Sequence, residues 1–305
     1  MMVIGFLACV SLIRHLSRDF TPDPQYITNA ALYSLVGGVV GARLFFIIHY
    51  FDEFRSNPLE VFEIWRGGLE LAGGVVAAVI VVLFYLWYHK LPIRRYLDIL
   101  AISLMLALAF GRIGCFLNGC CYGKPTELPW GVRFPYNSFA YISQINADLE
   151  RNRPEPQLPL PKEQYLDYPG TNGKWYPKHY EDLTLRQKIE VTEGKYRCLP
   201  VHPTQLYSSG MAAFWCLVLY LFWCRTKNAE ITGRSGKFLI KTGYTFALMF
   251  IVYGITRFLM EYLRDDNPFE FDSLTISQII SVGMFVLGMF LMVIFMKIKA
   301  KPLDI

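Results

Sequence analysis

The sequence alternates long apolar runs with short polar connections, and a single longer polar stretch interrupts this pattern. A helix of about 20 apolar residues crosses a hydrocarbon core of about 30 Å, and most of the apolar runs approach that length. The pattern therefore predicts an all-α integral membrane protein with about seven transmembrane helices, the first of them truncated. The six full spans are predicted near Thr28–Tyr50, Leu71–His89, Leu97–Asn118, Gln205–Cys224, Thr242–Leu263 and Leu274–Met296.

The first apolar segment, Met1–Ile13, has 13 residues and is too short to span a bilayer. Its positive charges, Arg14 and Arg18, follow it, whereas a signal peptide carries them in front. The run Phe6–Cys9 resembles a lipoprotein cleavage box but lies very close to the start. We expect the true first helix to begin upstream of Met1.

The polar stretch follows the fourth predicted span and is rich in proline, glycine and charged residues, without a long periodic run. Aromatic islands such as Trp130–Pro135 favour an ordered structure over a disordered linker. We predict an extramembrane arm or head of irregular strands and short helices. The chain then divides into helices one to four at residues 1–122, the arm or head at 123–200, and the last three helices at 201–305.

Basic residues cluster on one side of the predicted spans. Thirteen follow the first, third, fifth and last apolar segments, and the short loops on the other side hold three. The positive-inside rule places the larger set, and the C-terminus, in the cytoplasm, and places the polar stretch and the loops at Phe51–Glu70 and Arg264–Ser273 outside. The net charge of +5 thus reflects topology, and no nucleic-acid partner is expected. The larger set is Arg14, Arg18, Lys90, Arg94, Arg95, Arg225, Lys227, Arg234, Lys237, Lys241, Lys297, Lys299 and Lys301; the smaller is Arg55, Arg66 and Arg264.

The sixth span carries polar side chains along one face. Tyr253, Arg257, Glu261 and Arg264 are spaced by four, four and three residues, which puts them within about 80° on a helix. Charges at membrane depth are costly, so each one needs a partner or a role. Arg257 and Glu261 predict either a structural ion pair or a cationic pocket whose arginine is oriented by the glutamate. A planar guanidinium suits a phosphate well.

Two further arginines lie in or at the end of predicted spans. Arg112 belongs to the glycine-rich run Gly111–Gly123 at the outer end of the fourth span, where glycine permits close approach of a helix or ligand. Arg112 either serves a site or snorkels to the surface above a glycine helix stop. Arg43, in the middle of the second span, is a structural or a binding residue.

Histidine and cysteine residues add candidates at the outer end. His202 opens the run His202–Tyr207, where the chain re-enters the membrane, and is a hydrogen-bonding residue, a phosphate ligand or a base. Gly67–Gly74 predicts a tight helix entry. An oxidising outer face would allow Cys198 to bridge to Cys120 or Cys121. No metal and no cofactor are expected, because no second Cys/His cluster exists.

These segments together resemble the prolipoprotein diacylglyceryl transferase family over nearly the whole chain. The family's run Gly-Arg-x-Gly-Asn-Phe-x-Asn-x-Glu-x-x-Gly is matched at Gly111–Gly123, and its His-Pro-Ser-Gln-Leu-Tyr-Glu element resembles His202–Ser208. Its Tyr-Gly-x-x-Arg-x-x-x-Glu-x-x-Arg element resembles Tyr253–Arg264, Gly-Gly-Arg resembles Gly41–Arg43, and the glycine-rich entry resembles Gly67–Gly74.

The chain also departs from the family pattern at four positions. Cys115 and Cys120 replace the signature asparagine and glutamate, Ala72 stands where many members have histidine, and Ser208 stands where glutamate ends its element. These changes bear on any mechanism that uses that glutamate or that histidine as a base. They indicate a divergent branch or a paralogue with an altered substrate.

The resemblance implies transfer of a diacylglyceryl group from phosphatidylglycerol to the lipobox cysteine in a prolipoprotein signal peptide, within the bacterial plasma (inner) membrane and toward its outer face. It implies a catalytic set and a substrate-binding set that share Arg112. A non-catalytic assembly factor, a lipid transporter or scramblase, and another lipid-headgroup enzyme remain the alternatives. The catalytic set is Arg112, Arg257, Glu261, His202 and Tyr253; the binding set is Arg112, Asn118, Gly123, Arg43 and Arg264.

Overall fold

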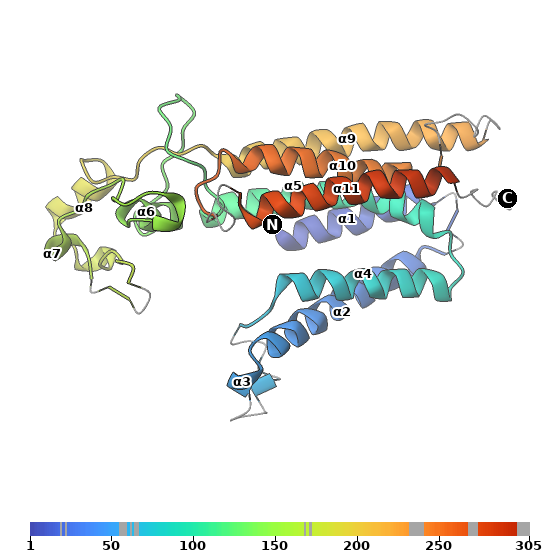
Figure 1. The fold of residues 1–305 in the computed structure, drawn as a ribbon, viewed down its shortest axis with the longest axis horizontal. Coiled ribbons are helices and arrows are strands. Elements are labelled where there is room, and N and C mark those ends of the chain that lie inside the picture. Colours follow the sequence, from blue (N-terminus) through green and yellow to red (C-terminus); the bar gives the residue numbers. More distant parts are fainter. Residues whose placement is uncertain are drawn as a thin grey trace.

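The chain forms long helices that run side by side, with a smaller irregular part at one end (Figure 1). The computed structural model describes residues 1–18, 20–21, 23–54, 60–61, 63, 67–167, 169–170, 173–231, 241–267 and 274–297. The long helices are α1 (Met2–Leu16), α2 (Gln25–His49), α4 (Leu71–Tyr88), α5 (Ile93–Asn118), α9 (Thr204–Ile231), α10 (Tyr244–Glu261) and α11 (Ile276–Lys297).

Five of these helices are long and apolar enough to cross a membrane: α2, α5, α9, α10 and α11. The apolar helices Met2–Leu16 and Ala72–Tyr88 are shorter. All seven lie at predicted apolar segments, and the described residues form an all-α membrane protein. Many large apolar side chains are exposed on the outside of the helices, among them Val79, Phe84 and Phe290. This exposure fits a membrane protein, because a bilayer solvates apolar side chains.

One bundle contains α1, α5, α9, α10 and α11. Helix α5 packs against α1, α9 and α10, and α11 packs on α10. Its core includes Ile99, Ile102, Leu219 and Met249, each at most 5% exposed. This arrangement puts the predicted site residues of α5 and α10 on neighbouring helices.

Helices α2 and α4 form a separate pair beside the bundle (Figure 1). Glycine makes their close contact possible: a Cβ on Gly41 would lie 2.2 Å from Ala77 Cβ, and one on Gly73 would lie 2.7 Å from Gly41 O. Small residues at a helix crossing let two backbones approach in this way. The pair contacts α1 and α5 far less than α2 contacts α4, which leaves a cavity between them.

Residues 122–201 build a hydrophobic core of their own around Tyr141, Tyr165 and Val201. They contain the short helices α6 (Phe139–Ile145), α7 (Lys162–Tyr165) and α8 (Leu185–Thr192) and the 3-10 turns η3 (Leu149–Arg151) and η4 (Tyr180–Asp182). The predicted strands are absent from the described residues, where β pairing occurs only as isolated bridges. We call residues 122–201 the head.

The basic residues of the larger predicted set lie at the end of the helices away from the head, as far as the structure describes them (Figure 1). Arg55, Arg66, Arg234, Lys237, Lys299 and Lys301 lie outside the described residues, as do parts of the predicted loops Phe51–Glu70 and Arg264–Ser273.

Candidate active site

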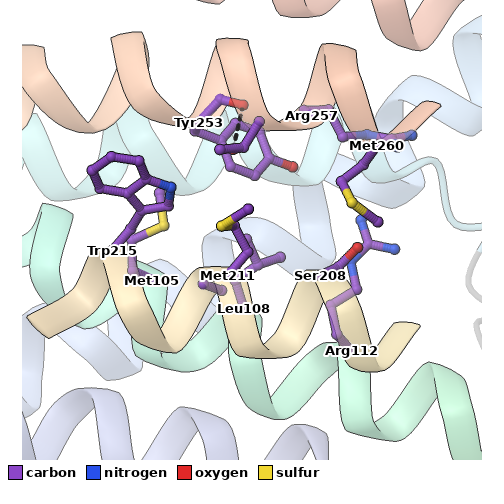
Figure 2. Close-up of a pocket in the computed structure, with 11 residues that line it drawn as sticks. Met105, Leu108, Arg112, Ser208, Met211, Trp215, Tyr253, Arg257 and Met260 are labelled. Atoms are coloured by element: carbon purple, nitrogen blue, oxygen red, sulfur yellow. Dashed lines mark hydrogen bonds between the residues drawn. The ribbon is translucent and has the colours of Figure 1, made fainter. Parts of the chain in front are cut away.

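A pocket lies between α5, α9 and α10 near the head, and two arginines line it (Figure 2). Arg112 extends from α5 and Arg257 from α10 at the same end of the pocket, with Met260 between them in this view. Tyr253 and Ser208 also line it. The free volume is about 30 Å³, so the lining side chains leave room for little more than a water-sized group.

A buried network holds Arg257 in place. Its Nη1 lies 2.7 Å from Glu261 Oε2, and its Nη2 donates to Ser277 Oγ at 2.8 Å. Glu261 is 4% exposed, and its other oxygen accepts hydrogen bonds from Thr275 (3.0 Å) and Asn267 (2.5 Å). A buried carboxylate that accepts hydrogen bonds on Oε1 and pairs with a guanidinium through Oε2 restricts the direction of that guanidinium. The predicted ion pair between Arg257 and Glu261 is present, and its service to a cationic pocket stays a prediction.

Arg112 differs from Arg257 in having no such network. Among the described residues, no carboxylate pairs with its guanidinium, and the guanidinium donates no hydrogen bond. It lines the 30 Å³ pocket and also the larger cavity between the bundle and the α2–α4 pair. A charged side chain at membrane depth is costly, so Arg112 stays a candidate for binding an anion.

A buried aspartate joins the two helices that carry these arginines. Asp98 of α5, 1% exposed, accepts hydrogen bonds from the backbone N–H of Gly243 (2.6 Å) and of Phe246 (2.9 Å) at the start of α10. The first N–H groups of a helix lack partners in the helix, and a carboxylate there is favourable. Our sequence reasoning missed Asp98, although a single carboxylate within an apolar span was a usable signal.

Three predicted motifs meet where the head joins the bundle. Gly123 N–H donates to His202 O at 3.1 Å, and Gly123 pairs with Arg264 as an isolated antiparallel bridge. A Cβ on Gly123 would lie 2.6 Å from His202 Cβ, so only glycine fits there. Gly123 is therefore a packing position at this junction. Asn118 is exposed one residue before Gly119, which ends α5.

The side chain of Arg264 forms an ion pair with a neighbouring aspartate. It is 6% exposed and makes two hydrogen bonds to Asp266, Nε to Oδ1 (2.8 Å) and Nη2 to Oδ2 (2.6 Å). The adjacent Asp265 pairs in the same way with Arg151 and Arg153 of the head, each at 2.9 Å. Arg264 thus belongs to an ion-pair network that ties the head to α10, and it does not line the pocket of Arg112.

Arg43 is also occupied, here by backbone carbonyls. Its guanidinium donates to the oxygens of Glu60, Val61, Gly67 and Gly68 at 2.5–3.0 Å. The guanidinium also lies over the rings of Phe46 and Phe54. These contacts fit the structural alternative, in which Arg43 holds the connection between α2 and α4.

His202 lies at the edge of the head, outside the pocket of Arg112. Its Nδ1 is 3.5 Å from the hydroxyl of Tyr207, which in turn accepts a hydrogen bond from Trp130 Nε1 at 2.7 Å. If His202 acts as a base, it must take the proton from this position outside the pocket.

The predicted bridge from Cys198 to Cys120 or Cys121 is wrong in this structure, where all seven cysteines are free. Cys198 is 3% exposed inside the head core, and its thiol donates to Gln144 Oε1 at 3.4 Å. Burial raises the pKa of the Cys198 thiol to about 11. The core of the head encloses Cys198 and so separates it from the cysteines that follow α5.

The sequence model of the prolipoprotein diacylglyceryl transferase family matches residues 1–294. The chain belongs to this family. A phosphatidylglycerol–prolipoprotein diacylglyceryl transferase of Clostridium tetani is 29% identical over 95% of this chain and 89% of its own length. Transferases of the same name from Burkholderia cenocepacia and Burkholderia multivorans are 28% and 27% identical, each over 96% of this chain and 88% of their own lengths.

Proposed function

We propose that this protein transfers the diacylglyceryl group of phosphatidylglycerol to the cysteine thiol in the lipobox of prolipoprotein signal peptides. The observation that carries the proposal is the convergence of Arg112 and Arg257, from different helices, on one pocket within the membrane bundle. One guanidinium is fixed by Glu261 and the other has no partner among the described residues. Together they form a preorganised site for an anionic phosphate.

The chemistry assigns a role to each of these groups. The thiolate of the substrate attacks the glyceryl carbon, the C–O bond breaks, and glycerol phosphate leaves with the electron pair. Arg112 and Arg257 stabilise the charge that develops on the leaving phosphate, and Glu261 keeps Arg257 directed at it. Tyr253 donates a hydrogen bond to the headgroup. The nucleophile belongs to the substrate, so no nucleophilic residue of this chain is needed.

The size of the pocket sets a condition on this mechanism. A free volume of about 30 Å³ admits a water-sized group, and a glycerophosphate headgroup needs more. Met211 and Met260 line the pocket, and methionine side chains change conformation at low cost. Headgroup binding therefore displaces these side chains and brings the phosphate between the two guanidinium groups.

Two larger cavities offer space for the remaining parts of the substrates. A mostly apolar cavity of about 690 Å³ lies between α1, α2, α4 and α5 and includes Arg112 at its edge. A more polar cavity of about 780 Å³, between the head and the segment that follows α10, includes Asp148, Arg153 and Asp265. We assign the acyl chains to the apolar cavity and the residues that follow the lipobox cysteine to the polar one.

We also propose the number of spans and their orientation in the membrane. Seven helices span the bacterial plasma membrane, the head and the site face outward, and the C-terminus is cytoplasmic. The distribution of basic residues supports this orientation. Asn118 contacts the headgroup, and Gly123, Arg43 and Arg264 shape the site by holding the surrounding segments together. His202 is a candidate base.

The experiment that tests the proposal uses membranes containing the protein, phosphatidylglycerol and a lipobox peptide, with mass spectrometry of the peptide. Addition of one diacylglyceryl group is expected with phosphatidylglycerol, and none with phosphatidylethanolamine or with a peptide whose cysteine is replaced by serine. Arg112→Ala and Arg257→Ala should each abolish the addition while the protein still inserts. Near-normal conversion by either variant, or no conversion by the folded wild-type protein, would contradict the assignment.

A further inference from the structure

Three cysteine thiols lie together at the end of α5. The sulfur atoms of Cys115, Cys120 and Cys121 are all within 4.8 Å of one another, and none is in a disulfide. Two of them stand where the family signature has asparagine and glutamate. The clustered thiols have no part in the mechanism derived above.

The end of α5 explains why these thiols meet. Gly119 is left-handed (φ 71°), its N–H donates to Phe116 O at 3.1 Å, and the N–H of Cys120 donates to Cys115 O at 3.2 Å. This pair of bonds is a Schellman motif, which brings the side chains of its first and sixth residues into contact. Cys121, at φ 58°, then turns its side chain back toward the same place.

Buried side chains from α9 hold this turn in position. Thr204 Oγ1 donates to Cys121 O at 2.7 Å, and Gln205 Nε2 donates to Cys120 O at 2.6 Å. Thr204 is 1% exposed and Gln205 is fully buried. The backbone that carries two of the three thiols is thus fixed by neighbours, as a preorganised ligand set requires.

We propose that Cys115, Cys120 and Cys121 bind one zinc ion through three thiolates. Zn–S bonds of about 2.3 Å in tetrahedral geometry place sulfur atoms about 3.8 Å apart, so the thiols need to close by about 1 Å at most. The described residues supply no fourth cysteine, histidine or carboxylate to this group. Three protein ligands with an open fourth position are typical of catalytic zinc, so the lack of a second Cys/His cluster does not exclude a metal here.

The three clustered cysteines line both the apolar and the polar cavity described above. Cys115 lines the apolar cavity together with Arg112, and Cys120 and Cys121 line the polar cavity. Arg112 precedes Cys115 by three residues and so shares its face of α5. Its positive charge offsets the net charge of −1 that three thiolates and one Zn²⁺ carry together.

The open position fits the lipobox thiol, an assignment that rests on the proposed function. The thiol binds zinc as thiolate and releases its proton to solvent. The sulfur then forms a bond to the glyceryl carbon, the C–O bond breaks, and the phosphate leaves with the electron pair. A metal that deprotonates a coordinated thiol makes a protein base unnecessary, which suits a chain with Ala72 and Cys120 at the family's histidine and glutamate positions.

The first test measures metal in the full chain, purified in detergent without chelators, by inductively coupled plasma mass spectrometry. About one zinc per chain is expected for the wild type and for Cys216→Ser, a matched control on α9. Zinc should be lost from Cys120→Ser and from the variant with all three cysteines changed to serine. A wild type without bound zinc after zinc loading, a different metal in its place, or a disulfide among these cysteines would overturn the proposal.

The second test replaces zinc with Co²⁺ and records the thiolate-to-cobalt charge-transfer absorption. The band should change when the lipobox peptide is added and stay unchanged with the serine peptide; an unchanged band with both would refute the open-position assignment. The two proposals fail separately. If the wild type lipidates the peptide without zinc, the proposed function stands and the metal site is refuted. If it binds zinc and does not lipidate the peptide, the metal site stands and the proposed function is refuted.

Discussion

Arg112→Ala separates a functional from a structural role better than any other substitution in the site. The variant removes a guanidinium that has no ion pair or hydrogen bond among the described residues, so no partner is left behind. Removing one partner of a buried ion pair leaves the other charge unpaired and costs about 3–5 kcal/mol of stability. Here that cost is absent.

The magnitudes follow from the different surroundings of the two arginines. Loss of one preorganised group that stabilises developing charge slows the chemical step by about 10²–10³-fold, or about 2.7–4 kcal/mol. Loss of a charge at membrane depth returns up to about 2.5–3.5 kcal/mol of insertion free energy. We therefore expect Arg112→Ala to lose activity at least 100-fold while the free energy of unfolding stays unchanged or rises.

The assay compares initial rates of peptide lipidation with denaturant unfolding in the same detergent. Arg225→Ala is the matched control, because Arg225 is exposed on α9 at the end away from the head. The control should keep full activity and stability. A loss of several kcal/mol of stability in Arg112→Ala, or a rate close to the wild type, would refute the functional reading of Arg112.

The other predictions concern the supports of the site. Glu261→Gln should lower the free energy of unfolding by about 3–5 kcal/mol and reduce lipidation, because Arg257 loses its buried partner; an unchanged denaturation midpoint would argue against the network. Asp98→Asn replaces one of the two oxygens that accept from the N–H groups at the start of α10 by an amide donor. It should lower the free energy of unfolding by about 1–3 kcal/mol in denaturant, and an unchanged value would argue against a positioning role for Asp98. His202→Gln should slow lipidation less than Arg112→Ala, whereas a folded and fully inactive variant would support His202 as the base. Cys198, whose pKa burial raises to about 11, should resist alkylation at pH 8 until the protein unfolds, and stability should fall as the pH rises toward that value; rapid labelling of the native protein would contradict its burial.

The helices were predictable because hydropathy at membrane depth is a strong constraint. Every predicted apolar segment is a helix, and the ends of α2, α5 and α11 lie within a few residues of their predicted limits. The clustering of Arg257 and Glu261 was also accessible, since it depends only on helical spacing.

The partners of the other charged residues depend on tertiary contacts that periodicity does not contain. Arg43 is satisfied by carbonyls about 20 residues away, and Arg264 by Asp266, which lies just after the helix. The cysteine cluster depends on the turn at Gly119 and on Thr204 and Gln205, whose hydrogen bonds cross from another helix. Residue type and spacing alone can suggest that such residues belong to a site. They do not show which of these residues already have partners elsewhere in the fold.

A structure of the protein with bound phosphatidylglycerol would show whether Arg112 and Arg257 bind one phosphate together. We predict phosphate oxygens at about 2.7–2.9 Å from both guanidinium groups, with Met260 displaced. A phosphate bound elsewhere, with the two arginines still separated by Met260, would contradict it.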